Sequence, residues 1–461
     1  MQARSIRTVG LLSAVTLALS LGLAGCGNSG DTSNNSSSTT PTDTGSAAAS
    51  SAAEQVTVTI GTFNNFGYDK SSATIQGADL YTKYMSLHPD VKVVATVAAT
   101  SDDARAAFTT AIGAGSGAYD IQAVDIDWMP FIMDNADKFT DLKSALAAND
   151  YLPWKLAQAT TADGKVLGGG TDIGPEGICY RSDLLDAAGI PSDRASVATW
   201  LGGANATWAS YFDAGKEYVE KSGGKAFFDS AAATYQGMVN QVESSYVDKD
   251  SDDIIATTNQ TIKDLYDQVT SAAMDDKESA GLQQWTDDWN AAFKSTGDNS
   301  FATMLCPAWI INNIKNNAGE DFVGWDIADV FPGGGGNWGG SFLVIPAQSK
   351  NAAAAADLVA WLTAPEQQAA VFTAASNYPS SPTAEADPAV SGKTEPFLNN
   401  APVGQIFESR AAAVNVVPYK GSAYFDIQTK MADALNRVDV TKSQSAADSW
   451  NQWISDAKAL S

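Results

Sequence analysis

The stretch at residues 331–346, FPGGGGNWGGSFLVIP, decides how we interpret this chain. It places six glycines around Trp338 and then continues into the apolar run 342–345, which has the composition of a buried strand. A glycine-rich loop that leads into a strand lets backbone and an aromatic face approach another group closely. The alternative is a glycine-rich surface turn, so the sequence on either side must decide between the two.

The N-terminus has the pattern of an export signal. Arg4 and Arg7 precede an apolar run over 9–23, which is too short to cross a bilayer. The string LAGC at 23–26 resembles the lipobox of bacterial lipoproteins, which implies that Cys26 becomes the lipidated first residue once the signal peptide 1–25 is removed. The alternative is an ordinary signal cleaved elsewhere, with a structural cysteine.

Residues 26–53 are rich in Ser, Thr, Asn, Gly and Ala and contain no large apolar side chain. Such a segment buries too little surface to offset its ordering entropy, so we expect a lipidated, disordered tether. The remaining body is long enough for two domains, and its 12 Trp, 14 Tyr and 17 Phe support sizeable cores.

The formal charge of −25 becomes −27 once Arg4 and Arg7 leave with the signal. A chain this acidic is a poor partner for nucleic acid and for anionic lipid headgroups. The acidic run 248–253 lacks the glycine and the glutamate of a calcium loop, so we expect a solvated surface and no metal or other cofactor. Cys179 and Cys306 lie in strand-like apolar runs, and the sequence is compatible with either a disulfide or two free buried thiols. Our hypothesis is that they pair.

Strand and helix patterns alternate along the body. Strands are expected at 56–63, 91–97 and 119–126, with helical patterns between them, and the same alternation restarts after Gly168. This succession predicts an α/β fold with mostly parallel sheets flanked by helices. Trp285 and Trp289 lie one helical turn apart, a spacing that favours one buried helix face.

Three segments carry a family resemblance. They are GKVLGGGTDIGPEGICYRSDLLDAAGIP at 164–191, MLCPAWIINNIK at 304–315 and NWGGSFLVIPAQSK at 337–350. In this order they resemble the sugar-binding lipoproteins of bacterial ABC importers, the family 1 sugar-binding proteins. Gly169 and Gly170 depart from the leucine and proline usual in that family, which puts the stiffness of the first hinge in doubt.

The resemblance implies a two-lobed periplasmic-binding-protein-like fold, in which each lobe is a mostly parallel sheet flanked by helices and the ligand cleft lies at the hinge. The lobes implied are 54–171 with 343–397, and 172–342 with 398–461. The chain would cross between lobes near 170–172, near 342–346 and somewhere around 397–410. Open α/β sheets bind ligands at their carboxyl strand ends, so the cleft should lie there.

Sugar recognition needs flat apolar faces together with carboxylates or amides that take paired hydroxyls. The candidate ligand-binding residues of these types at strand ends and loops are Asn64, Asn65, Phe66, Asp127, Trp128, Asp172, Glu176, Trp309, Asn337, Trp338, Gly339 and Tyr378. The competing structural roles are turn caps for the asparagines, helix capping for Asp127, backbone bracing for Asp172 and Glu176, and core packing for the aromatic residues.

An enzyme is disfavoured, because the single histidine, His88, has no nucleophile partner and GxSxG, P-loop and HExxH motifs are absent from the sequence. We expect a monomeric, lipid-anchored receptor on the extracellular face of the membrane, which delivers a carbohydrate to an ABC permease. The alternatives are a binder of a polyamine or peptide, and a glycoside-acting enzyme built on two carboxylates.

Overall fold

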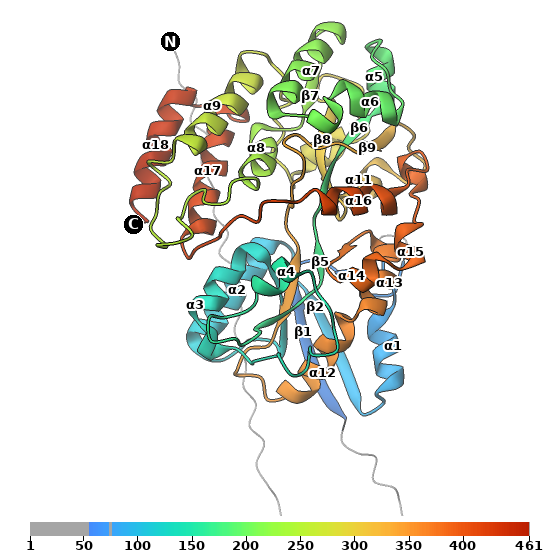
Figure 1. Ribbon diagram of the computed structural model, residues 1–461, viewed down its shortest axis with the longest axis vertical. Helices are drawn as coiled ribbons and strands as arrows, with labels where there is room; N and C mark the ends of the chain where they lie inside the picture. Colours follow the sequence, from blue (N-terminus) through green and yellow to red (C-terminus); the bar gives the residue numbers. More distant parts are fainter. Residues whose placement is uncertain (1–54, 73–75, 461) are drawn as a thin grey trace, which may run out of the picture. The chain divides into compact units, whose positions relative to one another are not determined.

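The computed structural model describes residues 55–72 and 76–460 (Figure 1). The expected signal peptide, tether and lipidated Cys26 lie outside the described residues. The described residues belong to one compact unit, whose strands form a five-stranded sheet, a four-stranded sheet and a two-stranded pair.

The first sheet has five strands in the order β2-β1-β3-β10-β4. They are β2 (Val91–Val97), β1 (Val56–Thr62), β3 (Ile121–Asp125), β10 (Ser341–Val344) and β4 (Gly168–Gly170). β1 is parallel to β2 and β3, whereas β10 is antiparallel to both of its neighbours. Four strands therefore run one way and β10 runs the other.

The second sheet has four strands in the order β7-β8-β6-β9. They are β7 (Ala226–Phe228), β8 (Phe301–Pro307), β6 (Glu176–Arg181) and β9 (Trp325–Ala328). β6 is antiparallel to both neighbours, while β7 and β8 are parallel. Again a single strand, β6, is reversed.

Both reversed strands follow a crossing between the sheets. The chain leaves β4, continues through β5 (Asp172–Ile173) and enters β6, and it returns from β9 through the glycine-rich loop into β10 (Figure 1). Such a strand enters its sheet from the end at which the other strands finish, so it must run against them. The expected two-lobed α/β fold is confirmed in this form, and β5 also pairs with β11 (Tyr378–Pro379).

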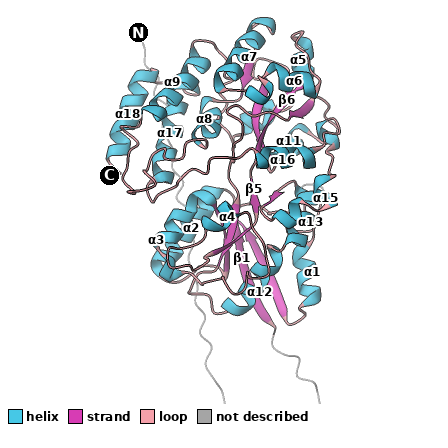
Figure 2. Ribbon diagram, in the orientation of Figure 1, coloured by secondary structure: helices cyan, strands magenta, loops and turns pink. Residues whose placement is uncertain are grey.

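Helices cover both faces of each sheet (Figure 2). Those packed around the first sheet are α1 (Leu80–Leu87), α2 (Ser101–Ala114), α3 (Met129–Asp134), α4 (Pro153–Ala157) and α12 (Ala352–Leu362). Those around the second are α5 (Ser182–Ala187), α6 (Arg194–Trp200), α7 (Trp208–Lys221), α8 (Ala231–Val239), α9 (Gln260–Met274), α10 (Asp287–Ala292), α11 (Ile310–Ala318), α17 (Tyr424–Asp439) and α18 (Ala446–Lys458). The helices α13 (Pro365–Ala375), α14 (Pro382–Glu385), α15 (Pro388–Ser391) and α16 (Val403–Ala412) contribute side chains to one core of the second sheet, and α13 also packs Val371 into a core of the first.

Strand β10 shows why the apolar run after the glycines is a strand. Phe342 and Val344 pack into the core on one face of the first sheet, and Leu343 packs into the core on the other. All three are at most 1% exposed. Alternating side chains of a strand point to opposite faces, and each such burial stabilises the fold by about 1.5–3 kcal/mol. The prediction of a buried strand here is confirmed.

Cys179 and Cys306 form a disulfide between the neighbouring strands β6 and β8, with Cα atoms 5.3 Å apart. The hypothesis that they pair is confirmed. Among the described residues, the helices lack the length and apolar character that a bilayer span requires.

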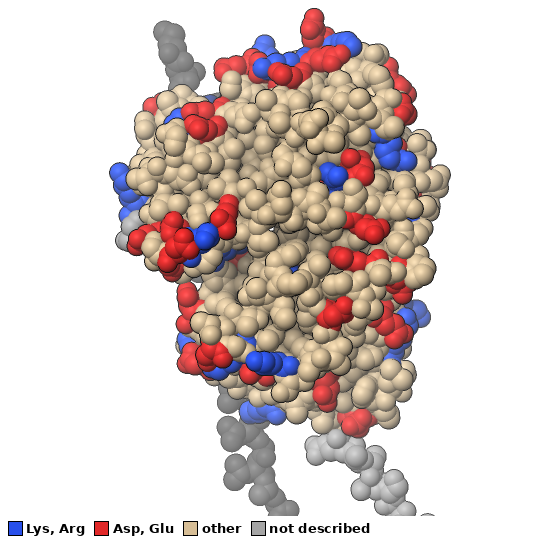
Figure 3. Space-filling view, viewed as in Figure 1, with Lys and Arg blue, Asp and Glu red and all other residues tan. Residues whose placement is uncertain are grey.

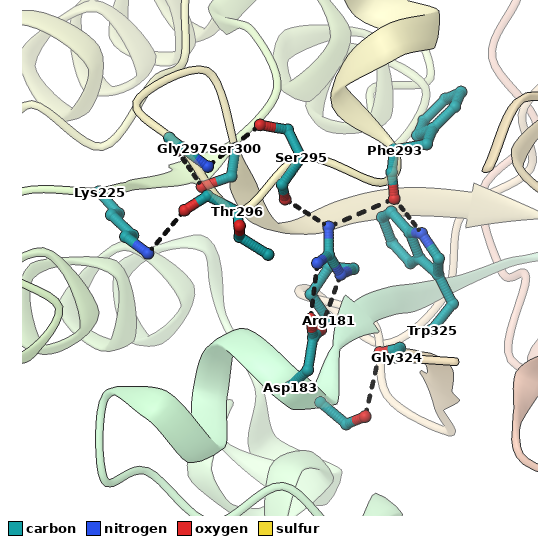
Figure 4. Close-up of polar contacts among 11 residues, drawn as sticks. Arg181, Asp183, Lys225, Phe293, Ser295, Thr296, Gly297, Ser300, Gly324 and Trp325 are labelled. Carbon is teal, nitrogen blue, oxygen red and sulfur yellow. Dashed lines mark hydrogen bonds and ion pairs between the residues drawn. The ribbon is translucent and has the colours of Figure 1, made fainter. Parts of the chain in front are cut away.

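Arg181, at the end of β6, is fully buried and fixes the loop after α10 (Figure 4). Its guanidinium pairs with Asp183 at 2.6 Å and donates to the carbonyl oxygens of Phe293, at 3.3 Å, and Ser295, at 2.9 Å. The Trp325 indole donates to the same Phe293 carbonyl at 2.7 Å. These bonds anchor the C-terminal end of α10 to the second sheet.

Candidate functional site

The two crossing segments are bound to each other at the point where Trp338 lies. The backbone N–H of Trp338 donates to the Gly174 carbonyl at 2.8 Å, and the Gly174 N–H donates to Asn337 Oδ1, also at 2.8 Å. A Cβ on Gly174 would lie 1.8 Å from the Trp338 carbonyl oxygen, so only glycine fits there. The Asn337 amide also donates to the Gly339 carbonyl at 3.1 Å. The loop is therefore braced against the first crossing.

Trp309 joins this arrangement from the start of α11. Its indole N–H donates to the Trp338 carbonyl at 3.0 Å, and the two rings meet edge to face with centroids 5.9 Å apart. Both side chains are half-buried. Part of each aromatic face therefore remains available at the crossing.

Carboxylates of the first sheet lie next to this loop. A Cβ on Gly339 would be 3.9 Å from Asp125 Oδ2 and 3.6 Å from the Trp309 indole nitrogen. Asp125 accepts from the Asp127 N–H at 2.9 Å, and burial together with the Asp127 charge raises the pKa of Asp125 to about 7. Burial and the Asp127 charge disfavour ionisation of Asp125, and nearby cations offset part of this effect.

Lys420 supplies one of these cations from the segment between α16 and α17. Its ammonium forms an ion pair with Asp127, and the exposed fractions of the two side chains are only 10% and 22%. Burial opposes the charge of Lys420, but the Asp127 carboxylate overcomes this and raises the pKa of Lys420. Since Asp127 follows β3 and Lys420 precedes α17, the pair joins the two lobes.

Lys155 of α4 supplies the second cation and is 1% exposed. Its Nζ lies 3.8 Å from the centroid of the Phe342 ring. Burial lowers the pKa of Lys155 to about 8, against the attraction of Asp172 and Asp125. Acidic and basic groups at the crossing are therefore in near balance.

A small pocket lies between the lobes at this place. Its lining comprises Ile126, Trp154, Gln158, Asn337, Val414, Val416, Val417, Pro418 and Lys420. Its volume is about 10 Å³, which is room for about one water molecule. A larger solute needs the lobes, or the segment 414–420, to move away.

Five of the candidate ligand-binding residues gather around this pocket and the crossing: Asp127, Trp309, Asn337, Trp338 and Gly339. Phe66 and Asp172 line a second small pocket together with Asn377. Asp172 accepts from Thr171 Oγ1 at 2.6 Å and from the Ser341 N–H at 3.0 Å, so it braces the crossing backbone.

The other candidates have structural surroundings. Asn64 and Asn65 accept from the backbone N–H groups two residues on, at 2.7 and 2.9 Å, and so form turns. Trp128 and Tyr378 are 2% and 0% exposed and pack in hydrophobic cores. Glu176 is fully buried, burial raises its pKa well above the usual range, and among the described residues its carboxyl oxygens have no hydrogen-bond partner.

Sequence reasoning missed Trp154, Lys155, Gln158 and the segment 414–420. Lys420 is 293 residues from Asp127, so no local pattern links them. Trp154 and Lys155 follow Pro153 at the first turn of α4, a helix start that the sequence did signal. Within the described residues, no group of three or more acidic, histidine or cysteine side chains is placed to hold a metal ion.

The structure has two α/β lobes with separate sheets, crossing segments that are hydrogen-bonded to each other, and a small pocket between the lobes. These features define a two-lobed binding protein of the periplasmic type. A sequence model of the bacterial extracellular solute-binding proteins matches residues 79–397. The chain belongs to this family of extracellular solute-binding proteins.

Solved structures and a curated relative agree with this assignment. An extracellular solute-binding protein of family 1 is 42% identical with a TM-score of 0.77, over 88% of this chain and 99% of that chain. A binding protein from B. animalis subsp. lactis, solved with β-1,6-galactobiose, is 17% identical with a TM-score of 0.71, over 88% and 97% of the two chains. The arabinooligosaccharide-binding protein of Halalkalibacterium halodurans is 23% identical over 269 residues, which is 54% of this chain and 56% of that protein. The chain thus aligns with about half the length of that relative.

Proposed function

We propose that this protein is the substrate-binding component of an ABC importer, which captures a sugar, and specifically an oligosaccharide, between its lobes and delivers it to a membrane permease. The observation that carries the proposal is the arrangement at the crossing between lobes, where the aromatic rings of Trp309 and Trp338 and the ion pair of Asp127 with Lys420 lie around a small pocket. Aromatic faces suit the C–H side of a pyranose, and charged acceptors suit its hydroxyls.

The charge balance favours a neutral polar ligand over a polyamine. Asp127 is paired with Lys420, and Lys155 lies near Asp125 and Asp172. A polyamine would bring further positive charge next to two buried ammonium groups, which is unfavourable in a pocket of low dielectric constant. A sugar hydroxyl has no such cost.

Relatives support the same choice. Proteins of this fold have been solved with β-1,6-galactobiose, with acarbose and with lacto-N-biose, and the curated relative is named for arabinooligosaccharides. The relatives are binding proteins, which supports a role as a receptor without catalysis.

Capture requires a hinge motion, because the pocket holds about one water-sized volume in this conformation. In the proposal, 54–171 with 343–397 moves as one lobe and 172–342 with 398–461 as the other. The paired crossing segments at 171–176 and 337–341 form the axis.

The proposal includes a monomer tethered through a lipidated Cys26 to the extracellular face of the membrane. Cys26→Ala tests this part alone: the variant should move from the membrane fraction to the medium with unchanged ligand binding. A variant that stays on the membrane contradicts lipid anchoring at this cysteine.

Isothermal titration calorimetry on the body from residue 54 tests the ligand class. The panel comprises galacto-, arabino- and malto-oligosaccharides of two to five units, with spermidine as the competing class. We expect heat and a rise in melting temperature with at least one sugar series. Binding of spermidine alone would overturn the sugar proposal in favour of the polyamine.

A further inference from the structure

Trp285 is an exposed tryptophan that lies outside the hydrophobic cores. Its side chain is 59% exposed, although it stands two residues before helix α10, which buries Trp289. Its backbone φ is +68°, a left-handed conformation that a bulky residue rarely adopts. Exposure of an indole and a strained backbone both cost stability, and such outliers concentrate at functional sites.

The sequence prediction that Trp285 and Trp289 share one buried helix face is wrong for Trp285. Trp289 is 0% exposed, as expected, but α10 begins only at Asp287 because the Thr286 hydroxyl caps it by accepting from the Trp289 N–H at 3.3 Å. Trp285 therefore precedes the helix and does not follow its periodicity.

The surroundings of Trp285 are fixed at both ends of α10. The carboxylate of Asp229 accepts from the Gln284 amide at 3.0 Å and from the Trp289 indole at 2.9 Å, which holds the segment that carries Trp285. At the other end, the Phe293 carbonyl accepts from Arg181 and Trp325 (Figure 4). Hydrogen bonds on both sides of α10 therefore fix the segment that carries the exposed indole.

Trp285 extends the aromatic cluster of Trp309 and Trp338 outward from the crossing. Its ring stacks on Trp309 with centroids 6.0 Å apart and an interplanar angle of 23°, and Trp309 in turn contacts Trp338. Three tryptophans from separate segments therefore form one continuous surface from the crossing to solvent.

We propose that Trp285, supported by Trp309, is an outer subsite that stacks on a pyranose unit lying beyond the pocket between the lobes. This inference rests on the proposed function and adds to it that the ligand is a chain long enough to reach from the pocket to Trp285. An exposed aromatic face adds contact area at little cost in side-chain entropy.

The test compares chain lengths in wild type, Trp285→Ala and Trp285→Gly. Calorimetry uses β-1,6-galacto-, arabino- and malto-oligosaccharides of two to five units. For the series that binds, we expect affinity for the longest members to fall about tenfold in both variants, while affinity for the shortest bound member changes less than twofold. Glycine accepts the positive φ without strain, so Trp285→Gly keeps the fold, which its melting temperature checks.

Trp450→Ala on α18 is the matched control, since it removes a half-buried indole that packs on Trp453 and Tyr266 in the second lobe. It should leave every affinity within twofold. Equal losses at all chain lengths, or no loss at any length, overturn the outer subsite and leave the proposed function intact. Failure of wild-type protein to bind any sugar in the panel overturns both.

Discussion

The ion pair between Lys420 and Asp127 should govern closure of the two lobes. Two opposite charges in direct contact attract by about 4–5 kcal/mol at an effective dielectric constant near 20. The cost of removing both groups from water offsets part of this attraction. With exposed fractions of 10% and 22%, the pair is largely buried, so we expect a net coupling of about 1.5–3 kcal/mol. If the pair forms when the lobes close on a bound sugar and is absent from the open state, its loss lowers the closed, sugar-bound population and weakens apparent sugar affinity about 10- to 100-fold.

A double-mutant cycle measures this coupling. Lys420→Met, Asp127→Asn and the double variant are titrated with the best sugar, and small-angle scattering without sugar reports the radius of gyration. We expect each single variant to lose affinity and expand, and the double variant to be little worse than either single one. Lys263→Met on the exposed pair with Asp267 is the control, and it should change affinity by less than about 0.5 kcal/mol. Additivity of the two single variants within about 0.5 kcal/mol would refute the reasoning.

The remaining predictions concern the loop, the disulfide and a buried acid. Trp338→Ala should lower sugar affinity more than tenfold with an unchanged circular dichroism spectrum. Unchanged affinity would favour the alternative interpretation of the loop as a surface turn. Replacing both Cys179 and Cys306 by serine opens a link across 127 residues and should cost about 2–5 kcal/mol in urea unfolding, and the unreduced body from residue 54 should show no titratable free thiol. Burial raises the pKa of Glu278 from its usual 4.5 to about 9, so the folded state binds this proton more tightly than the unfolded state does. The free energy of unfolding therefore falls as the pH rises from about 4.5 to 9. Glu278→Gln should therefore stabilise the protein more at pH 8 than at pH 5, and an equal effect at both would contradict that protonation state.

Much of the fold could be predicted from local patterns. The strand expected at 91–97 matches β2, because the alternation of its side chains specifies a strand. Pro365 stands at the first position of α13, where proline favours a helix start. The pocket was harder to predict from the sequence, because Lys420 reaches Asp127 only through the packing of α17 on the second lobe. Trp285 is a different case: Thr286 followed by two aspartates is a helix-start signal, and giving it precedence over the tryptophan spacing would have placed Trp285 outside the helix.

The glycine-rich stretch 331–346 lies close against the first crossing, as its composition indicated. Gly174 and Gly340 permit close approach: a Cβ on Gly340 would lie 2.7 Å from the Asp172 carbonyl oxygen and 3.0 Å from Lys155 Nζ. Such contacts fix Trp338 against the crossing strand before any ligand arrives. Preorganisation of this kind reduces the entropy that binding must overcome. The free energy of capture should then depend on the lobe-joining pair Lys420–Asp127 and on the segment 414–420, and substitutions there should alter affinity without touching an aromatic face.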